Sequence, residues 1–290
     1  MITANTLGSA FEQAFQMLKE AGVGEARLDA RLLVAHATEN ETATIFGFPE
    51  RPIENQQVLL LEASLQRRIA REPMAYILKT REFWSLPFIV SSDTLVPRPD
   101  SETLIEAVLE HIPETRRNLS ILDLGTGSGC LLLSLLSKFS NAIGIGVDAS
   151  EAALDIAKQN AAALGLEERA TFVVSDWTEK VEDQFDIVIA NPPYIPSSDI
   201  PNLEADVAQY EPLSALDGGA NGLDSYRKIL RQLPKVLTDD ASIFLESGAG
   251  QASAVSEMVR EIGFQHIETK KDLAGIERCV IGKLRILPII

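Results

Sequence analysis

Ile121-Leu122-Asp123-Leu124-Gly125-Thr126-Gly127-Ser128-Gly129 places a short apolar run directly before three alternating glycines. The apolar run predicts a buried strand, and the helical pattern over 128–138 puts the glycines at a strand-to-helix turn. Glycine lets a ligand approach the backbone closely, and the first turn of the helix offers it unpaired N–H groups. The stretch therefore predicts a ligand-binding turn in an α/β domain.

Strands and helices alternate from Leu119 to the end of the chain. The apolar and amphipathic patterns predict strands near 119–124, 143–147, 170–174, 185–190, 241–246, 264–269 and 277–283. Helices are predicted near 128–138, 150–164, 222–236 and 250–262. This alternation favours a mostly parallel sheet covered on both faces, in which ligands bind beyond the carboxyl ends of the strands. A long Pro- and Asp-rich loop is expected over 195–222.

The chain before this region has a different pattern. Apolar residues recur at helical spacing over 6–21, 25–37 and 58–69, without strand signals between them. We therefore predict a small helical bundle over 1–75, whose outer faces bind a partner protein. An aromatic hairpin or linker is expected over 76–100, and the α/β domain over 101–290.

The amino-acid composition limits the classes of function that this chain can have. The chain has 290 residues, 46% hydrophobic and 23% charged, which is ordinary for a soluble globular protein. A formal net charge of −16 argues against a large nucleic-acid footprint. Cys130 and Cys279 lie far apart, which favours a reducing, cytoplasmic location. No histidine has metal-ligand spacing, so no metal is expected, and no signal peptide or membrane span is predicted.

Two further acids follow the predicted second and third strands. The dinucleotide fingerprint GxGxxG would need glycine where this chain has Cys130, so a dehydrogenase is disfavoured. Asp148 stands where an acid hydrogen-bonds ribose hydroxyls. Asp176 could hold an adenine amine, and the Trp177 indole could pack on the base. Together with the glycines, these residues predict an adenosine ligand.

Asn191-Pro192-Pro193-Tyr194 follows the predicted strand 185–190. Neither proline has an N–H to donate, so their carbonyls and the Asn191 carboxamide are free to accept hydrogen bonds. Such a stiff acceptor pocket beside an aromatic ring suits a planar NH2 group, either an amide or the exocyclic amine of a base. A tight turn without chemistry is the structural alternative.

This set of motifs resembles the class I S-adenosylmethionine-dependent methyltransferases. The resemblance implies a Rossmann-like, seven-stranded sheet whose last strand is antiparallel. It also implies these cofactor-binding residues: Gly125, Thr126, Gly127, Ser128, Gly129, Asp148, Asp176, Trp177 and Asn191. Two groups that methylate planar nitrogens share the Asn/Asp-Pro-Pro-Tyr motif: amino-methyltransferases of nucleic acids and protein glutamine methyltransferases.

Five further stretches resemble the release-factor glutamine methyltransferases of the HemK/PrmC type. They are Arg71-Glu72-Pro73-Met74-Ala75-Tyr76-Ile77-Leu78, Arg81-Glu82-Phe83-Trp84, Pro97-Arg98-Pro99-Asp100-Ser101-Glu102, Tyr210-Glu211-Pro212-Leu213-Ser214-Ala215-Leu216 and Leu245-Glu246-Ser247-Gly248. Lys79 stands where the family usually has glycine, and Ser101 where threonine is common. Because Ser101 keeps the hydroxyl, little effect is expected there.

The resemblance implies methyl transfer to the glutamine amide in the Gly-Gly-Gln motif of bacterial class 1 peptide-chain release factors, a step of translation termination. Asn191, Pro192 and Tyr194 are then the expected catalytic residues, and Pro193 completes the substrate-binding motif. Phe83 and the 97–101 turn are expected to close over the methionine end or the substrate. The alternatives are an adenine amino-methyltransferase of DNA or RNA, and a non-catalytic S-adenosylmethionine-binding scaffold.

Overall fold

The computed structural model describes residues 2–115 and 117–284. The chain divides into two compact units. The first unit holds the residues up to Lys79 together with the segment Glu204–Tyr210, and the second holds Thr80–Leu203 and the residues from Glu211 onward. The three-part division at residues 75 and 100 stays a prediction of the sequence.

Helices form the first unit, because its apolar residues recur at helical spacing. The three predicted helices are confirmed as α1 (Leu7–Glu20), α2 (Ala26–Thr38) and α4 (Asn55–Ile69). Their apolar faces share one hydrophobic core in which Leu7, Leu33 and Leu65 are fully buried. The Thr6 hydroxyl caps α1 by accepting a hydrogen bond from the Ser9 backbone N–H.

Two short helices of the first unit escaped the sequence analysis. They are α3 (Thr42–Gly47) and α5 (Met74–Leu78), which are too short to show a helical period. Lys79 ends α5 in the left-handed conformation with φ of 59°. A side chain in that conformation costs roughly 1–2 kcal/mol, which explains why glycine suits this position.

The long loop after Asn191-Pro192-Pro193-Tyr194 contains short helices: η2 (Ile200–Asn202), α9 (Ala205–Tyr210) and η3 (Leu213–Ala215). Of these, α9 belongs to the first unit. The Tyr210 hydroxyl donates to the Ala70 carbonyl at 2.6 Å, and Arg68 lies 3.8 Å from Asp206. Arg68 also pairs with the buried Asp29 at 2.7 Å. These contacts join α9 to α4 and α2 across a long sequence separation.

The second unit begins with an antiparallel hairpin, β1 (Thr80–Phe83) and β2 (Leu86–Ile89). Asn160, on the buried face of α8 (Glu151–Ala163), holds this hairpin. Its carboxamide oxygen accepts from the Ile89 N–H at 2.7 Å, and its Nδ2 donates to the Ile89 carbonyl at 3.0 Å. The same Nδ2 donates to the Ser128 carbonyl at 2.9 Å. One fully buried side chain therefore links the hairpin to the glycine turn.

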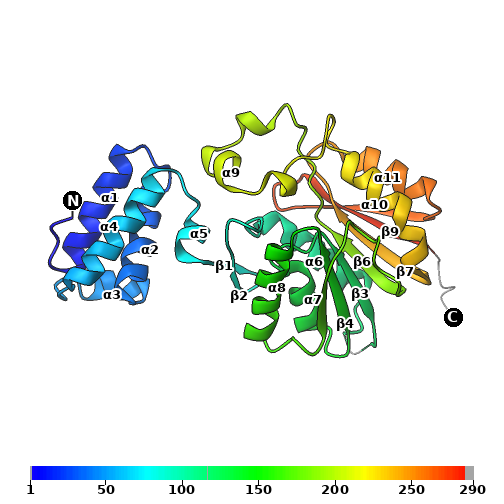
Figure 1. Cartoon of the computed structure of the whole chain (residues 1–290), viewed down its shortest axis with the longest axis horizontal. Helices are drawn as coiled ribbons and strands as arrows, with labels where there is room; N and C mark the ends of the chain where they lie inside the picture. Colours follow the sequence, from blue (N-terminus) through cyan, green and yellow to red (C-terminus); the bar gives the residue numbers. More distant parts are fainter. Residues whose placement is uncertain (1, 116, 285–290) are drawn as a thin grey trace. The chain divides into compact units, whose positions relative to one another are not determined.

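A seven-stranded sheet with the order β5-β4-β3-β6-β7-β9-β8 forms the centre of the second unit (Figure 1). Its strands are β3 (Ser120–Leu124), β4 (Ile143–Asp148), β5 (Ala170–Val174), β6 (Phe185–Ala190), β7 (Leu237–Glu246), β8 (His266–Lys271) and β9 (Glu277–Lys283). The first five run parallel, whereas β9 is antiparallel to both of its neighbours. The predicted strands and the antiparallel last strand are confirmed.

Helices cover both faces of this sheet (Figure 1). One face carries α6 (Glu102–His111), α7 (Cys130–Lys138) and α8 (Glu151–Ala163), and α6 is preceded by η1 (Pro99–Ser101). The other face carries α10 (Asp224–Gln232), η4 (Leu233–Val236) and α11 (Ala252–Glu261). Each face has its own hydrophobic core. Within residues 2–115 and 117–284, no helix is both long and apolar enough to cross a bilayer.

Candidate active site

A cavity of about 320 Å³ opens beyond the carboxyl ends of β3, β4, β5 and β6. It brings together most of the residues singled out from the sequence: Gly125, Thr126, Gly127, Ser128, Asp148, Asp176, Trp177, Asn191 and Pro193. The turn carrying Pro97, Arg98 and Ser101 also lines it. Gly129, Pro192 and Tyr194 are not among its lining residues.

The glycine turn owes its shape to three positive φ angles. These are 73° at Gly125, 54° at Gly127 and 79° at Gly129, a conformation that favours glycine. The Asp148 carboxylate accepts from the Gly127 N–H and the Ser150 N–H, each at 2.9 Å. Asp148 therefore couples the turn after β3 to the start of α8, and it stays partly exposed beside the cavity.

Asp123 is a site residue that the sequence analysis did not single out. It lies under the glycine turn, 1% exposed, and accepts from the Thr126 hydroxyl at 2.6 Å. Burial raises the pKa of its carboxyl from 3.8 to about 7, which the Thr126 hydrogen bond partly offsets. The available signal was an acid inside a mostly apolar strand, one residue before its end and two before the glycine turn.

Asp176 and Trp177 follow β5 on the rim of the cavity. A Cβ placed on Gly125 would lie 3.4 Å from Trp177 Cζ3, which is ordinary contact, so the indole packs directly against the glycine turn. Trp177 itself has a positive φ of 54°. The Asp176 carboxylate pairs with the Lys228 ammonium of α10, and both side chains are about half exposed. The structure thus places both residues of this predicted pair on the wall of the cavity.

Glycines surround the backbone of Asn191-Pro192-Pro193-Tyr194. A Cβ on Gly218 would lie 2.8 Å from the Pro193 carbonyl oxygen, and one on Gly248 would lie 2.9 Å from Tyr194 Cδ2. These separations are too short for a side chain, so both positions require glycine. The Gln251 Nε2 donates to the Tyr194 carbonyl at 2.9 Å. The motif is therefore packed from two sides and held in one conformation.

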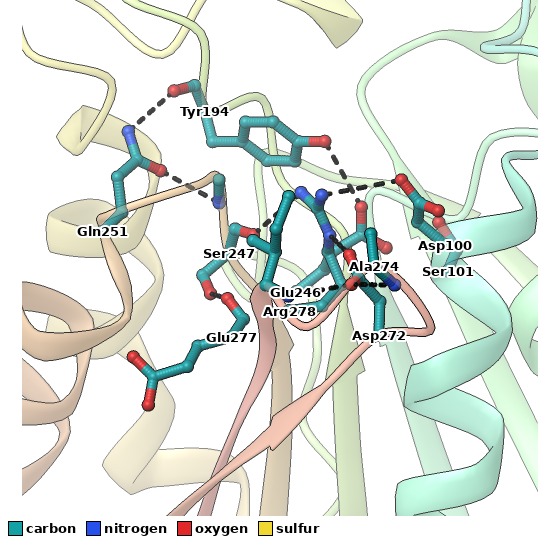
Figure 2. A network of polar contacts seen from close by, with 12 residues as sticks. Asp100, Ser101, Tyr194, Glu246, Ser247, Gln251, Asp272, Ala274, Glu277 and Arg278 are labelled. Carbon is teal, nitrogen blue, oxygen red and sulfur yellow. Dashed lines mark hydrogen bonds and ion pairs between the residues drawn. The ribbon is translucent and has the colours of Figure 1, made fainter.

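A buried acid lies beside this motif. Glu246 ends β7 and is 1% exposed, and its carboxylate accepts from the Tyr194 hydroxyl at 3.4 Å. The Ser101 hydroxyl lies against the same carboxyl and lowers its pKa, and the Asn191 Nδ2 donates to Ser101 Oγ at 3.2 Å. Figure 2 shows Glu246 between Tyr194 and Ser101, with Arg278 close by.

Charged groups brace the surrounding loops. The buried Arg278 donates to Asp272 at 3.2 Å, to the Ser247 carbonyl at 3.2 Å and to Asp100 at 3.5 Å (Figure 2). Arg98, which lines the cavity, pairs with Glu211 at 2.5 Å. The Glu211 side chain is 1% exposed, so this pair fixes the segment that leads into Pro212 at the cavity wall.

The expectation that Phe83 closes over the cavity is wrong. Phe83 is 1% exposed and packs against Phe88, with ring centroids 6.2 Å apart, in the core between the sheet and α6–α8. Phe83 lies in β1, where successive side chains face opposite sides, and its ring lies on the side that faces the core. The 97–101 turn, in contrast, does line the cavity.

Glu246 gives rise to a pH-dependent prediction. Burial raises the pKa of its carboxyl from 4.5 to about 7, so between these values the folded protein keeps a proton that the unfolded chain loses. The stability from this group is present below pH 4.5 and is lost as pH rises toward 7. The glutamine in Glu246→Gln cannot titrate. The free energy of unfolding of this variant, relative to that of the unmodified chain, should therefore be about 2 kcal/mol higher at about pH 7.5 than at about pH 5.5. Urea unfolding at both pH values measures this, and a pH-independent difference would contradict the raised pKa.

The sheet order, the glycine turn and the acid that closes β4 define a Rossmann-like methyltransferase. Residues 115–280 match a family described as a methyltransferase domain, and residues 9–78 match the PrmC N-terminal domain. The chain belongs to the release factor glutamine methyltransferase family. S-adenosylmethionine is accordingly the cofactor of this class, as the resemblance implied.

Relatives match over almost the full chain. A release factor glutamine methyltransferase of Rhodospirillum rubrum is 44% identical, over 98% of this chain and 86% of its own length. One from Bradyrhizobium diazoefficiens is 40% identical, over 97% of this chain and 96% of its own. A solved methyltransferase from Pyrococcus furiosus shares the fold with a TM-score of 0.51 and 16% identity, covering 78% of this chain and 98% of that one.

Proposed function

We propose that this chain transfers a methyl group from S-adenosylmethionine to the side-chain amide nitrogen of the glutamine in the Gly-Gly-Gln motif of class 1 peptide-chain release factors. The observation that supports this most is the position of Asn191, which lines the same cavity as the glycine turn. An acceptor for a planar NH2 group therefore stands beside the cofactor residues. The names of the relatives point to the same substrate.

The cavity fits the cofactor. S-adenosylmethionine, when bound, supplies an electrophilic methyl group. The positive φ angles of the Gly125–Gly129 turn and its missing side chains leave a cradle for a ligand. We assign Asp148 to the ribose hydroxyls, Trp177 to packing on the adenine, and Asp176, restrained by Lys228, to the adenine amine.

The acceptor residues address the chemical difficulty of the substrate. An amide nitrogen is a poor nucleophile because its lone pair is delocalised into the carbonyl. The Asn191 carboxamide oxygen and the Pro192 carbonyl would accept the two N–H hydrogens and orient the lone pair toward the methyl donor. Positioning supplies much of such a rate, and dipoles fixed in advance favour positive charge on nitrogen. Tyr194 would pack beside the glutamine.

The first unit is proposed to bind the release factor away from the glutamine. Apolar side chains lie exposed on its helices and directly after α3: Leu28, Phe46, Phe48, Leu59 and Leu60. Such exposed apolar groups are typical of protein-binding surfaces. We also propose a cytoplasmic location, consistent with the free thiols of Cys130 and Cys279.

Labelled methyl transfer tests this proposal with four acceptors under identical conditions. They are the intact release factor, the same factor with the Gly-Gly-Gln glutamine replaced by alanine, a short peptide carrying the motif, and duplex DNA. We expect label on the intact factor, none on the alanine variant or DNA, and a higher KM for the peptide than for the factor.

Each departure from this pattern has a defined meaning. Label on DNA would replace the proposal with the adenine amino-methyltransferase. Label on the alanine variant would mean that another residue is the target. Equal KM values for peptide and factor would remove the proposed binding role of the first unit.

A further inference from the structure

Glu246 lies next to Asn191 across the sheet. The register between β6 and β7 pairs Ala190 with Leu245, so Asn191 and Glu246 each lie one residue beyond that pair. Asn191 directly follows the end of β6 and Glu246 is the last residue of β7, so the two residues lie at the same level of the sheet. A buried carboxylate therefore stands beside the residue proposed to receive the substrate amide.

Two contacts join this carboxylate to opposite ends of the motif. The Tyr194 hydroxyl donates to Glu246 Oε1 at 3.4 Å. At the other end, Ser101 bridges: its hydroxyl faces the Glu246 carboxyl, whose pKa it lowers, and its oxygen accepts from Asn191 Nδ2 at 3.2 Å. Ser101 is 3% exposed and Glu246 1% exposed, so water does not readily take the place of either contact.

The hydroxyl of Ser101 has one hydrogen, and this fixes the direction of the chain of hydrogen bonds. When that hydrogen goes to the Glu246 carboxylate, Ser101 can only accept from Asn191. Asn191 must then turn its NH2 toward Ser101 and its oxygen away from it. Without the carboxylate, Ser101 could donate to the Asn191 oxygen instead, and the carboxamide could rotate to present its NH2 to the substrate NH2.

Glu246 contributes poorly to stability where it stands. Its Oε2 is buried and has no hydrogen-bond partner within the described part of the chain. The nearby guanidinium of Arg278 is engaged by Asp272, Asp100 and the Ser247 carbonyl. A buried carboxylate without a bonded cation is costly, and an apolar side chain would fill the space more cheaply. Its position is better explained by what it orients.

We propose that Glu246, acting through Ser101 and Tyr194, is a positioning residue that holds the Asn191 carboxamide oxygen toward the target amide nitrogen. This inference rests on the proposed function. It gives the release-factor glutamine a single binding orientation, in which both amide hydrogens meet acceptors. It also makes the Ser101 hydroxyl a requirement and not an incidental feature of the turn.

The test measures kcat and KM for methylation of the release factor, and the Kd for S-adenosylmethionine, for Glu246→Gln, Ser101→Ala and their double variant. Each single variant should lower kcat about tenfold and change the cofactor Kd less than twofold. Ser101→Ala removes the bridging hydroxyl, and the carboxamide in Glu246→Gln can donate to Ser101 as well as accept from it, so the direction of the hydrogen bonds is no longer fixed. The double variant should be no worse than the singles, because both act in one chain of hydrogen bonds. Ser101→Thr should restore most of the kcat lost in Ser101→Ala.

Glu257→Gln is the matched control, since Glu257 is an exposed acid of α11 paired with Arg260, and it should leave kcat unchanged. Unmodified kcat in Glu246→Gln and Ser101→Ala, additive losses in the double variant, or no rescue by threonine would each overturn the inference. If the unmodified chain fails to methylate the release factor, the proposed function itself fails. The two failures are therefore distinguishable.

Discussion

Replacing Asn191 with alanine is expected to lower kcat for methyl transfer roughly 10²–10³-fold, the loss typical when one fixed dipole is removed from the transition state. Alanine removes the carboxamide that Ser101 holds at 3.2 Å beside the cavity. The glutamine nitrogen would lose an acceptor and its fixed orientation. Asn191→Asp keeps an oxygen at the same place and should retain more activity than the alanine variant.

Steady-state methylation of the release factor measures this effect. Asn118→Ala is the control, because Asn118 is exposed and precedes β3 at the opposite end of the strand from the cavity. It should match the unmodified chain. Methyl transfer that survives Asn191→Ala unchanged would show that the carboxamide does not orient the substrate.

Replacing Asp148 with alanine is expected to raise the Kd for S-adenosylmethionine about a hundredfold. The Asp148 carboxylate accepts from two backbone N–H groups, at Gly127 and Ser150, and it is assigned to the ribose. Hydrogen bonds to a charged group contribute about 1.5–3 kcal/mol each. Losing the two hydrogen bonds to the ribose hydroxyls would therefore cost at least about 3 kcal/mol, which corresponds to about a hundredfold in Kd. Asp148→Asn keeps one acceptor oxygen, so its Kd should lie between those of the unmodified chain and Asp148→Ala.

Isothermal titration with S-adenosylmethionine gives the Kd directly. Asp155→Ala serves as the control, because Asp155 is an exposed acid on α8 that pairs with Lys158. A Kd for Asp148→Ala within a factor of two of the unmodified value would remove Asp148 from the cofactor site. If Asp148→Ala and Asp155→Ala lost the same affinity for S-adenosylmethionine, the cause would instead be weakened folding of α8.

The central strands of the sheet were predictable because they contain continuous apolar runs. Strands such as Phe185–Ala190, buried on both faces, stand out in the sequence without any alignment. The short helices α3 and α5 were not predictable, since five or six residues show no period. The docking of α9 in the first unit depends on single long-range contacts, such as Tyr210 with Ala70, that no local pattern encodes.

Part of the candidate site could also be predicted from the sequence, and part could not. The glycine turn and Asn191-Pro192-Pro193-Tyr194 were visible because prolines and glycines leave a strong local signal. Ser101 was expected to matter little, but its hydrogen bond to Asn191 crosses 90 positions and emerges only when α6 and β6 come together. Glu246 had no assigned role for the same reason. Phe83 was misplaced because an aromatic residue near a motif is as often core as site.

Tandem mass spectrometry of the release factor after reaction with this chain and S-adenosylmethionine tests the central claim most directly. We predict a single added methyl group, located on the side-chain amide nitrogen of the Gly-Gly-Gln glutamine and absent when Asn191→Ala replaces the unmodified chain. A methyl group on any other atom of the factor would contradict the claim that this cavity orients a glutamine amide. The claim would also be contradicted if this chain bound S-adenosylmethionine but left the release factor unmethylated.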